Sequence, residues 1–508
     1  MRALAAIILA RTLSTLAMRE PRALRHVAGR ATELAGGLVQ REHTFTCPLD
    51  WSAAPAAPAD GARAETIDVY VRELVLAKHG AGGAQLPYLL YLQGGPGFPA
   101  PRPGAPPTGW LKSALDTYRV LLLDQRGVGR STPVTAETLV TRGDAEAQAR
   151  YLTCLRADSI VRDCEAVRVA LGGDACKLTL LGQSYGGFCI LTYLSLFPAS
   201  LERALLTCGL APVGQSAEAV YRSTFERMRE RNRRFYQRYP QDAPKVRAIA
   251  RALRDAPAPL PSGGTLTVRR FLQLGLLLGS STGFETLHQL LEAPFLGAHT
   301  MPPAGAPVRL SREFLRDVEA RQAGFETNPI YWLLHEAIYA DGPHQPTAWA
   351  AHRVLRDELA GSPFDVDAAL AHADARAGAD GAAATGDAAA AEPPPLYLSG
   401  EMVYPWMAAD YAELAPLAPA AELVARKADW PRLYDEDALR ACAVPVAALV
   451  AYDDIYVERA FSERVAQLLG ERCVIWVTNQ FAHSGLRDDP TVFAKLLEMS
   501  KGEGGIPS

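Results

Sequence analysis

The sequence predicts a doubly wound α/β fold, in which a mostly parallel sheet is interrupted by an inserted helical domain. Runs of residues that are apolar on both faces alternate with helical segments, as buried parallel strands and their connecting helices do. A long helical stretch without such runs separates an early group of strands from a late group. Together these observations indicate one layered core that carries an insertion.

The first half of the chain supplies most of the expected strands. Each is a run of apolar or β-branched residues that ends at a turn signal. These runs cover residues 43–51, 66–77, 86–93, 118–124, 177–183 and 204–212. Helices are expected over residues 156–171 and 188–197, on either side of the fifth run. We therefore assign residues 39–213 to the first part of the core.

The strand pattern stops near Gly214, and a mostly helical segment follows. We assign residues 214–440 to an inserted helical cap domain. Within it, the charge-rich residues 218–238 are interpreted as a solvated helix face. The Ala-rich residues 366–395 have too few bulky apolar side chains to offset chain entropy, so we expect a disordered loop there.

The last segment of the chain, residues 441–508, is expected to complete the core. Strands are predicted over residues 444–454 and 473–480, and a helix around residues 458–470 lies between them. This strand–helix–strand order adds two further parallel strands to the sheet.

Composition excludes several classes of protein. The chain has 508 residues, of which 49% are hydrophobic, so a large core is available. Its 52 basic and 56 acidic residues give a net charge of −4, which argues against nucleic-acid or membrane partners. The eight cysteines lack the spacing of a metal site, and most lie in apolar runs. We therefore expect a reduced, intracellular protein.

Residues 1–38 are interpreted as an N-terminal extension. Their first thirty residues hold six arginines and one acidic residue, Glu20, as mitochondrial transit peptides and basic amphipathic helices often do. The apolar run Ala3–Ala10 is too short to span a bilayer. We expect a cytoplasmic location, with the mitochondrion as the alternative and secretion as the least favoured.

Residues 182–186, Gly-Gln-Ser-Tyr-Gly, match the pattern G-x-S-x-G directly after an expected strand and before an expected helix. In that context the pattern describes a strained turn that lifts a serine hydroxyl above the sheet, with small residues that let the chain pass. A serine in front of a helix can otherwise be a simple cap. The strand, the turn and the additional Gly187 together predict Ser184 as a catalytic nucleophile.

A nucleophilic serine needs a base, and the base needs an acid that fixes its tautomer. Where the serine lies on such a turn, the acid ends a late strand and the histidine follows the last strand. His483 is the one histidine beyond residues 444–454, so it is the predicted base. Asp453 and Asp454 both end that segment. We favour Asp454, because the D-I-Y-V run that begins there parallels one that commonly follows this acid in related hydrolases.

Backbone N–H groups are expected to hold the negative charge that develops during attack by the serine. One belongs to Tyr185, the residue after the nucleophile. The other belongs to the loop of residues 94–97, Gly-Gly-Pro-Gly, where we assign Gly95. Such a loop alone would be an ordinary turn, but its place beside the serine turn favours an oxyanion hole.

Six longer segments carry a further signal. They are QGGPGFPAPRP (93–103), LLDQRGVGRSTP (122–133), GQSYGGFCILTYL (182–194), HEAIYA (335–340), SGEMVYPWM (399–407) and DDIYV (453–457). In this order they resemble the prolyl aminopeptidase (proline iminopeptidase) family of α/β-hydrolases, over roughly residues 40–500. The resemblance implies removal of an N-terminal proline from peptides, without a metal or organic cofactor. Gln93 departs from it, since many members have histidine there.

The resemblance also implies a site for the charged imino group of the substrate. It assigns this role to Glu336 and Glu401, as buried carboxylates that offer charge-assisted hydrogen bonds. Aromatic residues nearby in the sequence suit a small apolar pocket for a pyrrolidine ring. Asp124 and Arg126, by contrast, are interpreted as scaffold that ties neighbouring loops together.

Two other functions remain open at this point. A carboxylesterase or amidase would use the same triad with a different cap pocket. A binding protein on an inactive hydrolase fold is less favoured, because the sequence fills all three triad positions. The expected partners are peptides with an N-terminal proline, and the oligomeric state is not predicted.

Overall fold

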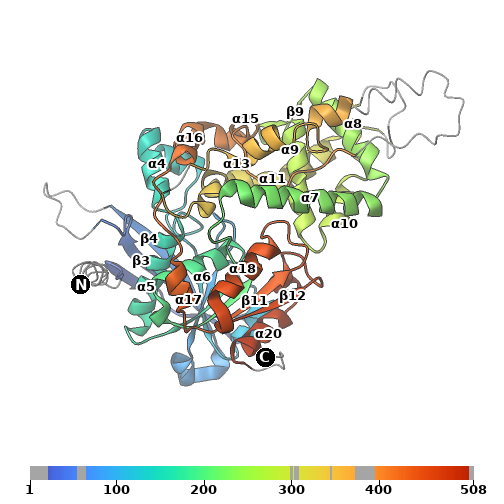
Figure 1. Cartoon of the computed structure of the whole chain (residues 1–508). Coiled ribbons are helices and arrows are strands. Elements are labelled where there is room, and N and C mark those ends of the chain that lie inside the picture. The colour runs from blue at the N-terminus through green and yellow to red at the C-terminus, as the bar shows by residue number, and fades with distance from the viewer. Residues whose placement is uncertain are drawn as a thin grey trace, which may run out of the picture.

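The computed structural model describes residues 21–53, 65–297, 301, 308–343, 346–371 and 395–502. Residues 1–20 of the expected extension and residues 372–394 of the expected disordered loop lie outside these ranges. Figure 1 shows a twisted sheet with helices on both faces and a second group of helices gathered above it.

In the described residues, ten strands form the main sheet, in the order β1–β3–β4–β6–β5–β7–β8–β11–β12 with β2 beside β3. The strands are β1 (Arg25–Ala28), β2 (Thr32–Leu34), β3 (Leu38–Pro48), β4 (Thr66–Leu76), β5 (Tyr88–Leu92), β6 (Arg119–Leu123), β7 (Leu178–Gln183), β8 (Leu201–Thr207), β11 (Val446–Ala451) and β12 (Cys473–Thr478). Neighbours from β6 to β12 are parallel, whereas the pairs that involve β1 to β4 are antiparallel. The predicted mostly parallel, doubly wound sheet is confirmed.

The sheet begins earlier in the chain than the sequence predicts. β1 pairs antiparallel with residues 43–46 of β3, and β2 pairs with the first residues of β3. All four residues of β1 are exposed, so no apolar alternation marks this strand in the sequence. Residues 25–28 and 32–34 of the expected extension therefore belong to the sheet.

Alternate residues of the central strands enter two separate hydrophobic cores, one on each face of the sheet. In β5, Leu90 and Leu92 belong to the larger core, whereas Leu89 and Tyr91 belong to the smaller one. The larger core includes residues of α5 (Ala157–Gly172) and α6 (Tyr185–Leu196), and the smaller includes residues of α2 (Gly109–Ala114) and α20 (Thr491–Ser500). Because both faces are covered, these strands are apolar throughout, as the sequence indicates.

Between β8 and β11 the described chain is helical, apart from the short pair β9 (Ala258–Pro259) and β10 (Thr265–Leu266). Its α-helices are α7 (Ala217–Arg238), α8 (Asp242–Asp255), α9 (Val268–Leu272), α10 (Gly283–Leu290), α11 (Arg312–Thr327), α12 (Ile330–Leu334), α13 (Ala350–Arg353), α15 (Met407–Asp410), α16 (Ala418–Arg426) and α17 (Glu436–Arg440). Tighter or wider helical turns are η4 (Gln273–Gly279), η5 (Glu336–Tyr339), η6 (Val354–Glu358) and η7 (Ala412–Leu417). Figure 1 shows α7 to α16 together on one side of the sheet.

The remaining α-helices lie in the segments that contain the sheet. They are α3 (Ala136–Val140), α4 (Ala145–Thr153), α18 (Arg459–Leu469) and α19 (Gly485–Asp488). Helix α4 packs against α16, so a connection of the sheet also contacts the inserted helices.

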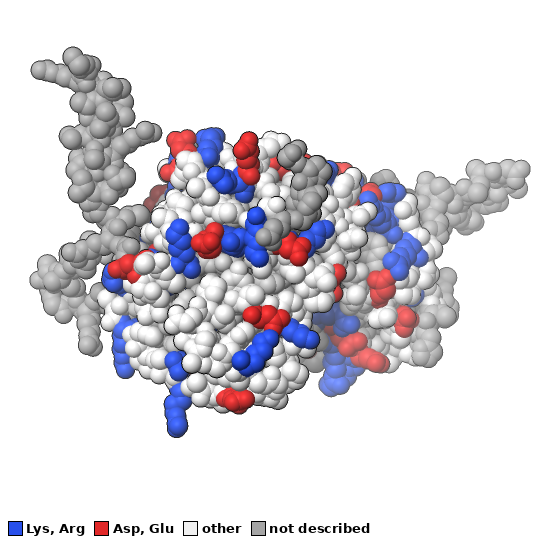
Figure 2. All heavy atoms as spheres, turned by 90° about the horizontal axis from the view of Figure 1, so that it is seen from below, with Lys and Arg blue, Asp and Glu red and all other residues white. Residues whose placement is uncertain are grey.

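Charged side chains of both signs lie on the surface (Figure 2). On the face seen in Figure 2, basic and acidic side chains are interspersed, and neither sign gathers into a large patch. No described helix combines the length and the apolar character needed to cross a bilayer.

Candidate active site

Ser184 lies at the turn between β7 and α6. Its φ of 56° and ψ of −126° lie in a region that non-glycine residues rarely adopt. A Cβ on Gly186 would lie 2.0 Å from the carbonyl oxygen of Leu92, and one on Gly182 would lie 2.7 Å from the backbone of Gly186. Ser184 is nevertheless partly exposed. A strained, accessible serine between close-packed glycines is the geometry that the G-x-S-x-G pattern predicts.

Asp454 and His483 form a buried hydrogen-bonded pair. His483 Nδ1 lies 2.8 Å from Asp454 Oδ2. The other carboxylate oxygen, Oδ1, accepts the backbone N–H groups of Tyr456 at 2.9 Å and Val457 at 3.2 Å. A carboxylate at Nδ1 favours a proton on that nitrogen and leaves Nε2 as a base.

Backbone contacts bring the histidine loop beside the serine turn. Gln183, which directly precedes the serine, donates from Nε2 to the carbonyl oxygen of His483 at 3.2 Å. The N–H of Ser184 donates to the carbonyl oxygen of Thr207 at the end of β8. The loop that carries His483 therefore lies beside the serine turn at the carboxyl ends of the parallel strands, where ligands bind in open α/β sheets.

The two aspartates that follow β11 have different partners. Asp453 Oδ2 accepts a hydrogen bond from Arg234 Nη1 on α7 at 2.6 Å. Asp454 instead contacts His483 and is buried. The geometry thus distinguishes the two residues, which the sequence chemistry could not do: Asp454 contacts the predicted base, whereas Asp453 contacts Arg234.

Cys208, Asp454 and His483 place a thiol, a carboxylate oxygen and a ring nitrogen within 4.8 Å of one another. Among the described residues this is the cluster with the ligand types of a metal site. Burial raises the pKa of the Cys208 thiol well above its usual value, and the charge of Asp454 adds to this effect. In the absence of a metal ion, the raised pKa keeps Cys208 a protonated thiol beside the Asp454–His483 pair.

The glycine-rich loop lies directly against the serine. A Cβ on Gly94 would lie 2.8 Å from Ser184 Cβ and 3.4 Å from Ser184 Oγ. Gly95 follows with a φ of 137°, in the region that favours glycine. Tyr185 is the first residue of α6. In the described part of the chain, neither the N–H of Gly95 nor that of Tyr185 donates to a protein acceptor, so both are available to an oxyanion.

Glu401 lies in an aromatic cluster formed by α12 and η5. Tyr339 donates its hydroxyl to Glu401 Oε1 at 3.4 Å, and His335 Nε2 lies 3.6 Å from Oε2. The hydroxyl of Tyr331 donates to the backbone carbonyl of Glu401 at 3.0 Å. Glu401 is 8% exposed, so the carboxylate is screened from most solvent. Such a carboxylate can form a strong, charge-assisted hydrogen bond with a cation.

Tyr456 links this cluster to the Asp454–His483 pair. Its ring meets the His483 ring edge-on, with 4.6 Å between centroids. Burial raises the pKa of Tyr456, and the charges of Glu401 and Asp454 raise it further, so both carboxylates lie near this phenol. The sequence analysis did not assign Tyr456 a role, although it lies in the quoted DDIYV segment.

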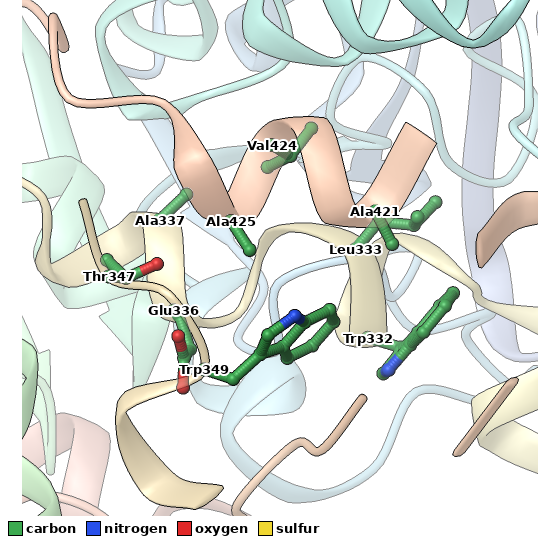
Figure 3. A pocket seen from close by; sticks show the side chains of 9 residues that line it. All are labelled: Trp332, Leu333, Glu336, Ala337, Thr347, Trp349, Ala421, Val424 and Ala425. Carbon is green, nitrogen blue, oxygen red and sulfur yellow. The ribbon is translucent and has the colours of Figure 1, made fainter. Parts of the chain in front are cut away.

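Glu336 has different surroundings. Its Oε1 accepts the backbone N–H of Ala351 at the start of α13 at 3.1 Å, and its buried Oε2 has no hydrogen-bond partner in the described residues. Burial raises the pKa of Glu336 to about 7. The carboxyl group lies beside Trp349 in a small pocket, shown in Figure 3. The pocket is lined by Trp332, Leu333, Glu336, Ala337, Thr347, Trp349, Ala421, Val424 and Ala425.

Asp124 and Arg126 are structural, as the sequence analysis interprets them. Asp124 accepts two hydrogen bonds from Arg102, at 2.8 and 2.7 Å, and further bonds from two backbone N–H groups. Arg126 donates to both oxygens of Asp163, at 2.7 and 2.6 Å, and to three backbone carbonyls. Both charges are buried and paired, so they tie loops together rather than face a substrate.

The fold of the sheet and the strained turn at Ser184 together define the chain as an α/β-hydrolase. A family model described as the alpha/beta hydrolase fold matches residues 87–282. The chain belongs to the proline iminopeptidase family within this class, because it is 43% identical to the proline iminopeptidase of Aeromonas sobria over 92% of its own length and 97% of that protein. This confirms the resemblance to that family.

A second relative supports this family. The chain is 34% identical to proline iminopeptidase aneH of Aspergillus aculeatus, over 82% of this chain and 83% of that protein. Among solved structures, esterase E22 matches with a TM-score of 0.42 and 12% identity, over 91% of this chain and 99% of that one.

Proposed function

We propose that this protein is a serine exopeptidase that releases an N-terminal proline from peptides through Ser184, His483 and Asp454. The observation that carries the proposal is the 2.8 Å contact between Asp454 and His483 Nδ1, beside a strained serine turn in a chain of this family. In the proposed reaction, His483 Nε2 takes the proton of Ser184 while the serine oxygen attacks the proline carbonyl carbon.

The remaining steps follow from the same groups. The N–H groups of Gly95 and Tyr185 hold the oxyanion. His483 then gives its proton to the departing amine, which leaves proline esterified to Ser184. Water, deprotonated by His483, attacks this ester and releases free proline. The reaction requires no group beyond the residues named and water.

Specificity for a free N-terminus is assigned to the helical segment. We propose that residues 214–440 act as a cap domain and that Glu401 and Glu336 hold the protonated imino group. Glu401 is the better supported of the two, since its charge acts on Tyr456, whose ring contacts the His483 ring. The free oxygen of Glu336 and the indole faces of Trp332 and Trp349 suit a cation as well.

The test compares chromophore release from a free-amine proline amide, its N-acylated counterpart and an alanine analogue. We expect rapid cleavage of the free proline amide alone, because acylation removes the charge that the carboxylates bind. Glu401→Gln should raise KM for this substrate. Cleavage of simple esters with the proline amide left intact would contradict the proposal and favour a carboxylesterase or amidase with the same triad.

A further inference from the structure

Three arginines of α7 share one face of the helix. Arg227, Arg231 and Arg234 are spaced by four and three residues, which is about one helical turn in each case. The sequence analysis interprets residues 218–238 as a solvated face. The structure instead shows each of these three guanidinium groups donating to a group outside α7. We call Arg227, Arg231 and Arg234 the arginine stripe.

The strongest contact of the stripe joins Arg227 to Glu458, just before α18. Nε and Nη2 of Arg227 donate to the two carboxylate oxygens at 2.6 Å each. Ser223, one turn earlier on α7, also donates to Glu458 at 2.9 Å. The Glu458 side chain is only 7% exposed, so this two-point contact is shielded from solvent.

The second ion pair of the stripe involves the residue before the predicted acid Asp454, whereas Glu458 follows that acid in the sequence. Arg234 donates to Asp453, the residue directly before Asp454. Residues 453–458, which we call the acid loop, are thus held by α7 at both ends. Within this loop Asp454 accepts the N–H groups of Tyr456 and Val457. The orientation of the Asp454 carboxylate therefore depends on the conformation of the whole loop.

The middle arginine reaches the histidine indirectly. Nε and Nη2 of Arg231 donate to the carbonyl oxygen of Leu278 in η4, at 3.1 and 2.7 Å. The next carbonyl, of Gly279, accepts the backbone N–H of His483 at 3.1 Å. The hydroxyl of Tyr456 donates to the carbonyl of Leu276 in the same turn. The inserted segment thus contacts both the acid loop and the base.

We infer that the arginine stripe is a positioning device that holds Asp454 and His483 in register with Ser184. This inference rests on the proposed function, because it takes these residues as the triad. Guanidinium–carboxylate pairs with two contact points fix direction as well as distance. A shift of a reacting group by about 1 Å can cost about a hundredfold in rate. The inserted segment would then set catalytic geometry, beyond covering the substrate.

The variants Arg227→Gln and Arg234→Gln test this inference, with Arg229→Gln as the matched control. Arg229 lies on the same helix, and it donates to Glu226 of α7, which receives no hydrogen bond from the stripe in the described residues. Arg227→Lys keeps the charge but cannot make the two-point contact with Glu458. If Arg227→Gln does not fold, Arg227→Lys replaces it in the comparison. Thermal unfolding is measured for each variant, so that all assays run on folded protein.

Two readouts separate positioning of the triad from shaping of the substrate pocket. The first is kcat and KM for the free proline amide. The second is the rate at which a fluorophosphonate labels Ser184, because this probe needs an activated serine and no amine site. We expect the glutamine variants to lower kcat and the labelling rate by the same factor, about tenfold to a hundredfold, with KM unchanged. Arg227→Lys should be intermediate, and Arg229→Gln should match the parent.

Unchanged labelling in the glutamine variants would overturn the inference. So would a rise in KM for the proline amide without a fall in the labelling rate, since the stripe would then act on the pocket. Failure of the proposed function is a distinguishable result. In that case the parent protein is labelled at Ser184 but leaves the proline amide intact, and the labelling comparison still tests the stripe.

Discussion

At the scale of single residues, Asp453 and Asp454 differ by one position and by their partners. Asp454→Asn replaces a carboxylate that accepts from His483 Nδ1 by an amide, which favours the wrong imidazole tautomer. We expect kcat for the proline amide to fall by about 10⁴-fold. Asp453→Asn leaves the contact between Asp454 and His483 in place, so kcat should fall far less in this variant. Steady-state kinetics of the two variants make the comparison, and equal losses would contradict the assignment.

The sequence could predict Ser184, His483 and Asp454 because each is marked by a motif or by its order in the chain. The roles of Tyr456 and His335 could not be predicted in the same way, since they depend on which side chains meet in space. Both residues lie inside segments quoted for the family resemblance. A motif therefore located the region, but only the fold showed what these side chains contact.

At the scale of elements, Glu336 of η5 accepts a hydrogen bond from α13, and its ionisation makes the free energy of unfolding depend on pH. Burial raises its pKa to about 7, from 4.5 in the unfolded chain. The folded protein then keeps a proton that the unfolded chain has lost in this range, so the free energy of unfolding falls as pH rises from about 4.5 to about 7. The difference in pKa corresponds to about 3 kcal/mol.

Glu336→Gln should remove this dependence, because an amide oxygen can still accept the Ala351 N–H but cannot ionise. We expect the variant to be more stable than the parent at pH 8 and similar to it at pH 4.5. Urea unfolding at a series of pH values measures this difference. A parent and variant that lose stability in parallel across that range would show that Glu336 titrates at its ordinary pKa.

The helices and strands could be predicted where their burial requires a recognisable pattern of apolar residues in the sequence. β5, β6 and β7 lie within one or two residues of their expected ends, because both faces of each strand are apolar. β1 was not predicted, since its exposed residues carry no alternation. On α7, charge alone did not distinguish arginines that face solvent from those that pair with the acid loop.

At the scale of the whole molecule, Arg126 ties the segments around the sheet together. It pairs with Asp163 on α5, and both side chains are almost fully buried. Arg126→Met would leave the Asp163 carboxylate buried without its partner, which typically costs about 3–5 kcal/mol. Urea unfolding measures this loss. Arg440→Met, which breaks an exposed pair with Glu436, should cost less than about 1 kcal/mol. Similar losses in both variants would contradict a scaffold role for Arg126.

The inserted helices contact the sheet domain at the point where the proposed chemistry takes place. η4 accepts the N–H of His483, and α7 pairs with both ends of the acid loop. Under the proposed function, substrate selection and triad geometry would share one segment of the chain. This arrangement was not predictable from the sequence, which shows an insertion but not its contacts with the core.

The central claim is that Ser184 carries the prolyl group as an ester during turnover. The most direct measurement is mass spectrometry of the protein after rapid acid quenching with an activated ester of free-amine proline. We predict a prolyl adduct on the peptide that contains Ser184, and no adduct with the N-acylated ester or in Ser184→Ala. A prolyl adduct on another residue, or equal labelling by the N-acylated ester, would contradict the account.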